Sequence, residues 1–347
     1  MRLGFPRALF FYDHYPFWFG FFQTLGIQLV LSPPTCKRIL EEGLKKANDG
    51  VCLPLKLLAG HIAAFRQIEV DAIFLPRMVS VEAGTYLCPK MLGVPESVAA
   101  LVPSGLPVLS ATVNWRDGRG AAEKALLDLG RRLGKPKKAV REAWEAGMAC
   151  ERAVRERQRQ AAGAAEYFVW LGQEDKRPED RARLPALIGA KPLRIALLGH
   201  SYLIHDAYAN LQVWEKLSAK AEVRVAENVS GAEIEQAVAG MHKKIFWSHG
   251  KRIFGAGRSF IDEEEIDGLI YLSCFGCGTD SMVQDMLARA AREKRKPYMM
   301  ITLDEHSGEA GLATRLEAFI DMLERRKRSE DHLSAPGKRL DRHSGVI

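Results

Sequence analysis

The first 116 residues alternate between short apolar runs and longer segments with apolar residues at helical spacing. Short apolar runs bounded by Gly, Pro or polar residues predict strands, and the longer periodic segments predict helices. Strands are expected over residues 2–5, 27–31, 71–75 and 107–113. Helices are expected over residues 16–25, 36–48 and 54–65, with Thr35 capping the second. Strands separated by helices predict a parallel sheet with helical crossovers.

The pattern changes between residues 117 and 191, where the chain is dense in Ala, Arg and Glu. Residues 118–133 and 137–171 predict two helices in this segment. The charged face over residues 151–159 is typical of a solvated connector. A Pro- and charge-rich link over residues 176–192 follows it.

A second alternation of strands and helices begins at residue 192. Strands are expected over residues 193–198, 222–226, 267–272 and 298–303. Helices are expected over residues 206–219, 232–241, 281–293 and 312–328. Residues 329–347 are polar, contain Pro and Gly, and are predicted to be disordered.

These patterns predict an α/β protein with two doubly wound, Rossmann-like parallel-sheet domains joined by a helical segment. The expected parts are an N-terminal α/β domain over 1–116, a helical connector over 117–191, a C-terminal α/β domain over 192–328 and a basic tail over 329–347. Ligands of open parallel sheets bind beyond the carboxyl ends of the strands. We therefore expect a metal site in the cleft between the two domains.

The composition agrees with a soluble protein of two ordinary domains. The chain has 347 residues, of which 47% are hydrophobic and 27% charged. A membrane span would need about 18 consecutive apolar residues, and the sequence has no such run. The first residues pass directly into a strand pattern without a signal-peptide core, so a cytoplasmic protein is expected.

The net charge of +7 does not predict nucleic-acid binding, because the basic residues are interleaved with acids along the chain. Two nucleotide signatures are also missing. The sequence lacks a P-loop, and the glycines at 255 and 257 lack the third glycine of a dinucleotide fingerprint. A hydrolase elbow of the G-x-S-x-G type is absent too. These absences argue against an ATPase, a Rossmann dehydrogenase and an α/β-hydrolase.

Four cysteines stand beside Gly or Pro at the expected ends of elements, namely Cys52, Cys88, Cys274 and Cys277. The start of a helix exposes backbone N–H groups that stabilise a thiolate, which is the form that binds metals. The other two, Cys36 and Cys150, fall within expected helices and indicate packing or surface positions.

The residues alone leave the chemistry of these cysteines open. Cys274 and Cys277 form a Cys-x-x-Cys pair, which zinc sites, iron–sulfur clusters and redox dithiols all use. A zinc ribbon pairs two such motifs, whereas Cys52 and Cys88 stand singly. A redox dithiol would leave those two unexplained. An iron–sulfur cluster accepts dispersed thiolates, so it is the favoured interpretation, with zinc, a dithiol and no site as alternatives.

The catalytic candidates lie at the ends of two other strands. His200 ends the strand over 193–198, and Asp304, Glu305 and His306 follow the strand over 298–303. Functional groups collect on such loops. The structural alternatives are a hydrogen-bonded core histidine and a cluster that caps the last helix.

Several stretches resemble the acyl-CoA dehydratase activase-related proteins, relatives of the 2-hydroxyacyl-CoA dehydratase subunits. The matching stretches are residues 4–9, 31–35, 52–56 with Gly60 and His61, 273–280, and 303–311 with 314–319. The resemblance implies two α/β domains that flank a [4Fe–4S] cluster, with Cys52, Cys88 and Cys277 as ligands. Cys274 departs from that pattern. It would be either a fourth ligand, which saturates the cluster, or a neighbouring thiol that tunes its potential.

The resemblance also implies partners and a function. A separate ATP-hydrolysing activase would supply a low-potential electron, and a dehydratase-like subunit with an acyl-CoA substrate would use it. The chain would then act in low-potential electron transfer or reductive radical chemistry. The alternatives are a non-catalytic electron-transfer or accessory subunit, and a zinc-binding structural protein.

Overall fold

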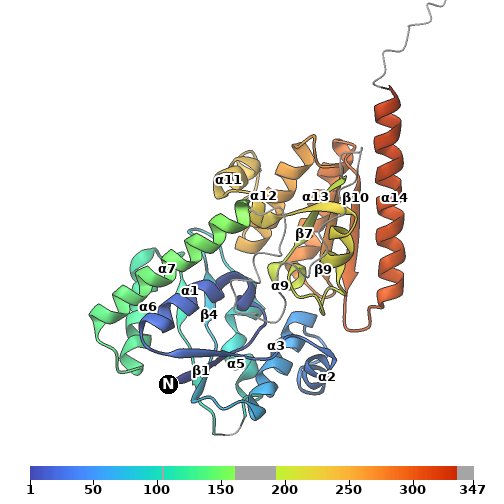
Figure 1. The fold of residues 1–347 in the computed structure, drawn as a ribbon. Helices are drawn as coiled ribbons and strands as arrows, with labels where there is room; N and C mark the ends of the chain where they lie inside the picture. Colours follow the sequence, from blue (N-terminus) through green and yellow to red (C-terminus); the bar gives the residue numbers. More distant parts are fainter. Residues whose placement is uncertain (104, 161–192, 334–347) are drawn as a thin grey trace, which may run out of the picture.

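The computed structural model of the chain describes residues 1–103, 105–160 and 193–333, and these residues form two parallel four-stranded sheets with helices around them (Figure 1). The first sheet has the order β2-β1-β3-β5 and the second the order β10-β9-β7-β8. The α/β class and the parallel sheets are therefore confirmed. No helix in the described ranges has the length and apolar character needed to cross a membrane.

The first sheet contains all four expected N-terminal strands. They are β1 (Arg2–Phe5), β2 (Gln28–Leu31), β3 (Ala72–Phe74) and β5 (Val108–Leu109). The expected strand over 107–113 is divided, because its second part, β6 (Thr112–Asn114), pairs in a separate small sheet with β4 (Arg77–Ser80). Pro76 lies between β3 and β4 and has no N–H to donate, so the ladder breaks there.

The helices of this half are α1 (Phe10–Thr24), α2 (Lys37–Lys46), α3 (Leu53–Ala64), η1 (Phe65–Gln67), α4 (Pro89–Leu92) and α5 (Val94–Ala99). Helix α1 begins six residues before its expected start and carries Pro16 inside it. The residue before α2 is Cys36, so the prediction of Thr35 as its cap is wrong. The Thr35 hydroxyl instead donates to Asp206 at 2.5 Å, in the other half of the molecule.

The helical segment after β6 packs against the first half and is not a purely solvated connector. It consists of α6 (Arg119–Arg132) and α7 (Lys137–Gln160), and α7 runs along α1 in Figure 1. The two helices approach closely at Gly147, where a Cβ atom would stand 2.7 Å from the Phe17 carbonyl oxygen. Val140, Ala143 and Trp144 of α7 are buried. The expected continuation to residue 171 and the link over 176–192 lie outside the described residues.

The second sheet contains β7 (Leu193–Gly199), β8 (Ala221–Val225), β9 (Gly268–Cys274) and β10 (Tyr298–Leu303), each close to its expected place. Its helices are α9 (Ser201–Ile204), α10 (Val213–Ser218), η3 (Ala226–Asn228), α11 (Gly231–Val238), α12 (Ser248–Asp262), α13 (Gly278–Glu293) and α14 (Glu309–Leu333). Because α14 reaches Leu333, residues 329–333 are helical and not disordered; residues 334–347 lie outside the described part.

Two predictions for this half are wrong. Of the single helix expected over 206–219, only the second part forms a helix, α10, and a turn over its first part separates α10 from α9. Asp206 accepts hydrogen bonds from the N–H groups of Tyr208 and Ala209, and Leu211 and Gln212 adopt left-handed backbone angles, which end a helix. Helix α12 was not expected, because its glycines lower helix propensity. One of them, Gly255, permits close packing, since a Cβ there would stand 2.7 Å from Ile234.

Candidate functional site

Three of the four singled-out cysteines stand at helix starts. Cys52 is the N-cap residue of α3, Cys88 that of α4 and Cys277 that of α13. Cys274 is the last residue of β9. Helix N-termini carry partial positive charge and stabilise thiolates, so the expectation from the Gly and Pro neighbours is confirmed for these three positions. Cys36 also precedes a helix, but it is exposed.

The four thiols come together from both halves of the molecule. The pKa of Cys52 is raised, mainly by burial. The charge of Lys90 opposes this rise, and negative charge on Cys277 or Cys88 adds to it. Burial also raises the pKa of Cys274 far above its usual range, and Cys52 and Cys277 add to this rise. These effects place Cys88, Cys274 and Cys277 in the surroundings of Cys52, so folding brings together cysteines that are far apart in the sequence.

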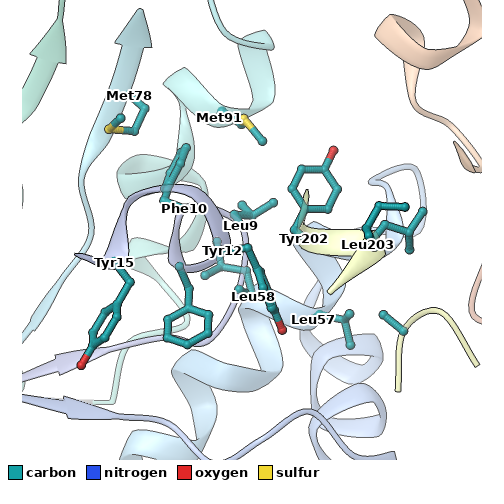
Figure 2. Close-up of a cluster of buried hydrophobic side chains, with 14 of the residues drawn as sticks. Leu9, Phe10, Tyr12, Tyr15, Leu57, Leu58, Met78, Met91, Tyr202 and Leu203 are labelled. Atoms are coloured by element: carbon teal, nitrogen blue, oxygen red, sulfur yellow. The ribbon is translucent and has the colours of Figure 1, made fainter. Parts of the chain in front are cut away.

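The surroundings of the thiols are apolar. Figure 2 shows Leu57 and Leu58 of α3 near Tyr202 and Leu203 of α9 in a cluster of buried side chains that both halves contribute. Cys274 belongs to the same cluster, and the other three cysteines pack against it. An apolar shell excludes water and strengthens electrostatic interactions within it.

A buried ion pair lies beside Cys277. His200 Nε2 is 3.8 Å from Cys277 Sγ and 3.3 Å from Asp280 Oδ1. Burial alone would lower the pKa of His200, but the Asp280 carboxylate and Cys277 raise it well above its usual range. Burial would raise the pKa of Asp280, but His200 lowers it below its usual value. The His200 ring therefore lies between the Asp280 carboxylate and the Cys277 sulfur, and both neighbours favour its protonated form.

These three side chains have the geometry of a cation site. The ligand atoms of His200, Cys277 and Asp280 all lie within 4.8 Å of one another. The Asp280 Oδ1 atom also accepts a hydrogen bond from the Tyr271 hydroxyl at 2.7 Å. Asp280 Oδ2 and His200 Nδ1 are buried without a hydrogen-bond partner in the described residues. Buried polar atoms without partners are rare and mark room for a further group.

Tyr202 completes this side of the site. Its ring stacks on the His200 ring, with centroids 4.9 Å apart and an interplanar angle of 11°. Burial raises the pKa of Tyr202 well above its usual range, and Cys277, Asp280 and Cys52 raise it further. Neither Tyr202 nor Asp280 was predicted from the sequence as a site residue. The position of Asp280 in the first turn after Cys277 was the available signal for it.

The other catalytic candidates have structural contacts. The Asp304 carboxylate accepts hydrogen bonds from the N–H of His306 and the hydroxyl of Ser307, which closes the turn before α14. Glu305 forms an ion pair with Lys56 on α3, across the junction of the two halves. The His306 side chain is exposed. These contacts favour the structural alternative for this loop.

A second set of buried charges lies where α1 meets α12 and η3. Burial would raise the pKa of Asp13, but His249, His14 and Arg252 lower it below its usual range. Arg252 and His205 likewise lower the pKa of Glu227 to about 2 against the effect of burial. A cavity of about 690 Å³ adjoins these groups. The His249 ring is 5.7 Å from the His200 ring, so this polar region reaches the surroundings of Cys277.

The comparisons with known proteins cover most of the described chain. Residues 2–229 match the sequence profile described as the CoA enzyme activase uncharacterised domain. Residues 197–323, which include Cys274, Cys277 and His200, match the profile of the 2-hydroxyglutaryl-CoA dehydratase D-component. No curated protein matches the chain. Since the first match spans more than half of the sequence, this chain belongs to the family of the CoA enzyme activase uncharacterised domain, with a C-terminal region like the dehydratase D-component.

Proposed function

We propose that the chain is an iron–sulfur protein of a CoA-thioester dehydratase or reductase system. A [4Fe–4S] cluster held between the two halves would exchange single electrons at low potential. The convergence of four thiols from both halves beside the His200–Asp280 pair carries this proposal. The resemblance to a CoA enzyme activase domain and to a dehydratase D-component supports it.

The donor set fits a cluster better than it fits a single hard cation. Thiolates are soft ligands that suit iron–sulfur clusters. A cluster with several thiolates carries net negative charge, which the helix N-termini at Cys52, Cys88 and Cys277 would stabilise. His200 adds a buried positive charge beside Cys277. These groups would hold the cluster and favour its reduction.

We assign Cys52, Cys88 and Cys277 as ligands and Cys274 as a neighbouring thiol. Cys274 is at the end of a strand, without a helix start of its own. Its Sγ–H donates to the Phe275 carbonyl oxygen at 3.5 Å. Three ligands would leave one iron open to a substrate, and the Cys274 thiol would tune its potential. If Cys274 is a fourth ligand, the cluster is saturated and the chain is an electron relay.

A partner protein would supply the electron. The sequence has no P-loop, so ATP hydrolysis would occur on a separate activase chain. Phe275 is 70% exposed and Met282 is 62% exposed, and they flank Cys277 on the Cys-x-x-Cys loop and α13. Exposed apolar side chains beside a redox centre suit the docking of an electron donor.

Metal and sulfide analysis of anaerobically purified protein tests the cluster. We expect a brown protein with about four irons and four sulfides per chain, the composition of the cluster type named above. A colourless protein that contains only zinc would refute the proposal and favour a mononuclear site at His200, Cys277 and Asp280, which have the matching geometry.

Single Cys→Ala variants test the ligand assignment. Cys52→Ala, Cys88→Ala and Cys277→Ala should lose iron, while Cys274→Ala should retain it with a shifted reduction potential. Cys36→Ala is the matched control, because Cys36 also precedes a helix but is exposed. Equal iron loss from all four site variants would indicate a saturated relay.

A further inference from the structure

A separate apolar pocket lies between α1, β6 and the helices α6 and α7. Its volume is about 230 Å³, and its walls include Phe17, Trp18, Trp115, Trp144 and Met148. A dry cavity of about 150 Å³ already accepts benzene, so this pocket has room for a somewhat larger apolar group. No cysteine among the described residues lines it. The pocket is therefore distinct from the site of the four thiols.

Two buried polar atoms belong to side chains that line this pocket. His14 Nε2 and Trp18 Nε1 have no hydrogen-bond partner in the described part of the chain. The exposed fraction is 8% for His14 and 1% for Trp18. Trp Nε1 is only a donor, whereas a His ring nitrogen donates or accepts according to the tautomer. Burying a donor without an acceptor costs free energy. A ligand with an acceptor group in the pocket would remove this cost.

The mouth of the pocket is positively charged. Arg152 and Arg155 line it, and Arg155 is paired at 2.6 Å with Glu151. His14 Nδ1 also lies 3.6 Å from Glu151, so that carboxylate already has two partners. Within residues 1–103, 105–160 and 193–333, no carboxylate lies within 4.0 Å of the Arg152 guanidinium. Arg152 thus leaves a surplus positive charge at the entrance.

The pocket adjoins the larger polar cavity. The two share four lining residues, namely His14, Val81, Arg152 and Arg155. A ligand whose apolar part fills the pocket would therefore extend toward the polar cavity. Its charged end would then remain beside the arginines.

We propose that this pocket binds an apolar carboxylate of medium chain length. The hydrocarbon part packs against Trp115 and Trp144, whose rings meet edge to face with centroids 5.8 Å apart. The carboxylate accepts a hydrogen bond from Trp18 Nε1 and pairs with Arg152. This site is independent of the metal, because its walls and its charge come from other residues.

Calorimetric titration of the purified full-length protein with octanoate tests the proposal, with 1-octanol as the neutral ligand of matched length. Octanoate should bind, and should quench the fluorescence of Trp18, Trp115 and Trp144, which line the pocket. Octanol should bind at least tenfold more weakly, because it lacks the charge. Equal binding of both ligands would overturn the proposal, as would binding of octanoyl-CoA without binding of octanoate.

Variants locate the binding. Arg152→Gln should weaken octanoate binding about tenfold, the effect of losing one charge-assisted contact. Arg157→Gln is the matched control, because Arg157 lies on the same helix, is exposed and does not line the pocket. Ala122→Leu should abolish binding by filling the pocket. Unchanged octanoate affinity in a folded Ala122→Leu variant would refute the proposed location. If that variant does not fold, equal octanoate affinities of Arg152→Gln and Arg157→Gln would refute the location instead.

Discussion

The ion pair between Lys56 and Glu305 is expected to contribute strongly to the stability of the junction between the two halves. Lys56 is on α3, the helix that begins after Cys52, and Glu305 is on the loop after β10. Their side chains are 6% and 16% exposed. In Glu305→Gln, the Lys56 ammonium stays buried without its counter-charge. Breaking a buried pair by removing one partner costs about 3–5 kcal/mol, and we expect about 3 because Glu305 keeps some contact with water.

Urea unfolding of single and double variants distinguishes the energy of the ion pair from the cost of burying its two charges. The single variants Glu305→Gln and Lys56→Met should each lower the free energy of unfolding. The double variant Lys56→Met/Glu305→Leu should have a free energy of unfolding within about 1 kcal/mol of the wild-type value, because apolar replacements of buried ion pairs are often near neutral. The control is Glu41→Gln in the surface pair with Lys37, whose side chains are 52% and 83% exposed. Surface pairs contribute about 0.2–1 kcal/mol. The reasoning is refuted if Glu305→Gln costs no more than Glu41→Gln.

Three further predictions concern packing, pH and the junction. Gly147→Leu should destabilise the protein by about 1–3 kcal/mol, because its Cβ would collide with the Phe17 carbonyl oxygen. Thermal melting beside Gly120→Leu on α6, where a Cβ meets open space, checks whether the effect is specific to helix packing. The pKa of Glu227 is lowered to about 2, below its unfolded value of 4.5, so its contribution to stability is present above about pH 5 and is lost as the pH falls toward 2. The urea midpoint should therefore fall less steeply from pH 7 to pH 3 in Glu227→Gln than in the wild type. An equal fall in both proteins would contradict the role of Glu227 in the pH dependence. Asp206→Ala should cost at least about 2 kcal/mol in urea unfolding, because it leaves the buried donors of Tyr12 and Thr35 without their acceptor; a loss below about 0.5 kcal/mol would contradict that role.

The strands could be predicted from local sequence because burial of a parallel sheet requires short, continuous apolar runs. The runs at 2–5, 193–198 and 298–303 reappear as strands with nearly the same bounds. Helices were predicted less well where long-range contacts override local preference. Helix α12 forms despite its glycines because Gly255 lets it pack closely against Ile234.

The cysteines that begin helices could be found in the sequence, because Gly and Pro beside Cys52, Cys88 and Cys277 act through the local backbone. The resemblance to CoA enzyme activase and dehydratase proteins was also visible in local motifs, and the family matches confirm it.

Only the tertiary structure decided which side chains meet at the site. The sequence separates His200 from Asp280 by two strands and several helices, yet folding brings His200 Nε2 and Asp280 Oδ1 to 3.3 Å of each other beside the Cys277 sulfur. Whether a polar side chain is paired, and whether its pKa shifts, depends on burial and on neighbours from other elements. For His200, Cys277 and Asp280 those neighbours are set by the pairing of β7 with β9, which brings the ends of both strands together. Local sequence thus specified the elements and the cysteines at their ends, and tertiary packing specified the charged surroundings that give those cysteines their chemistry.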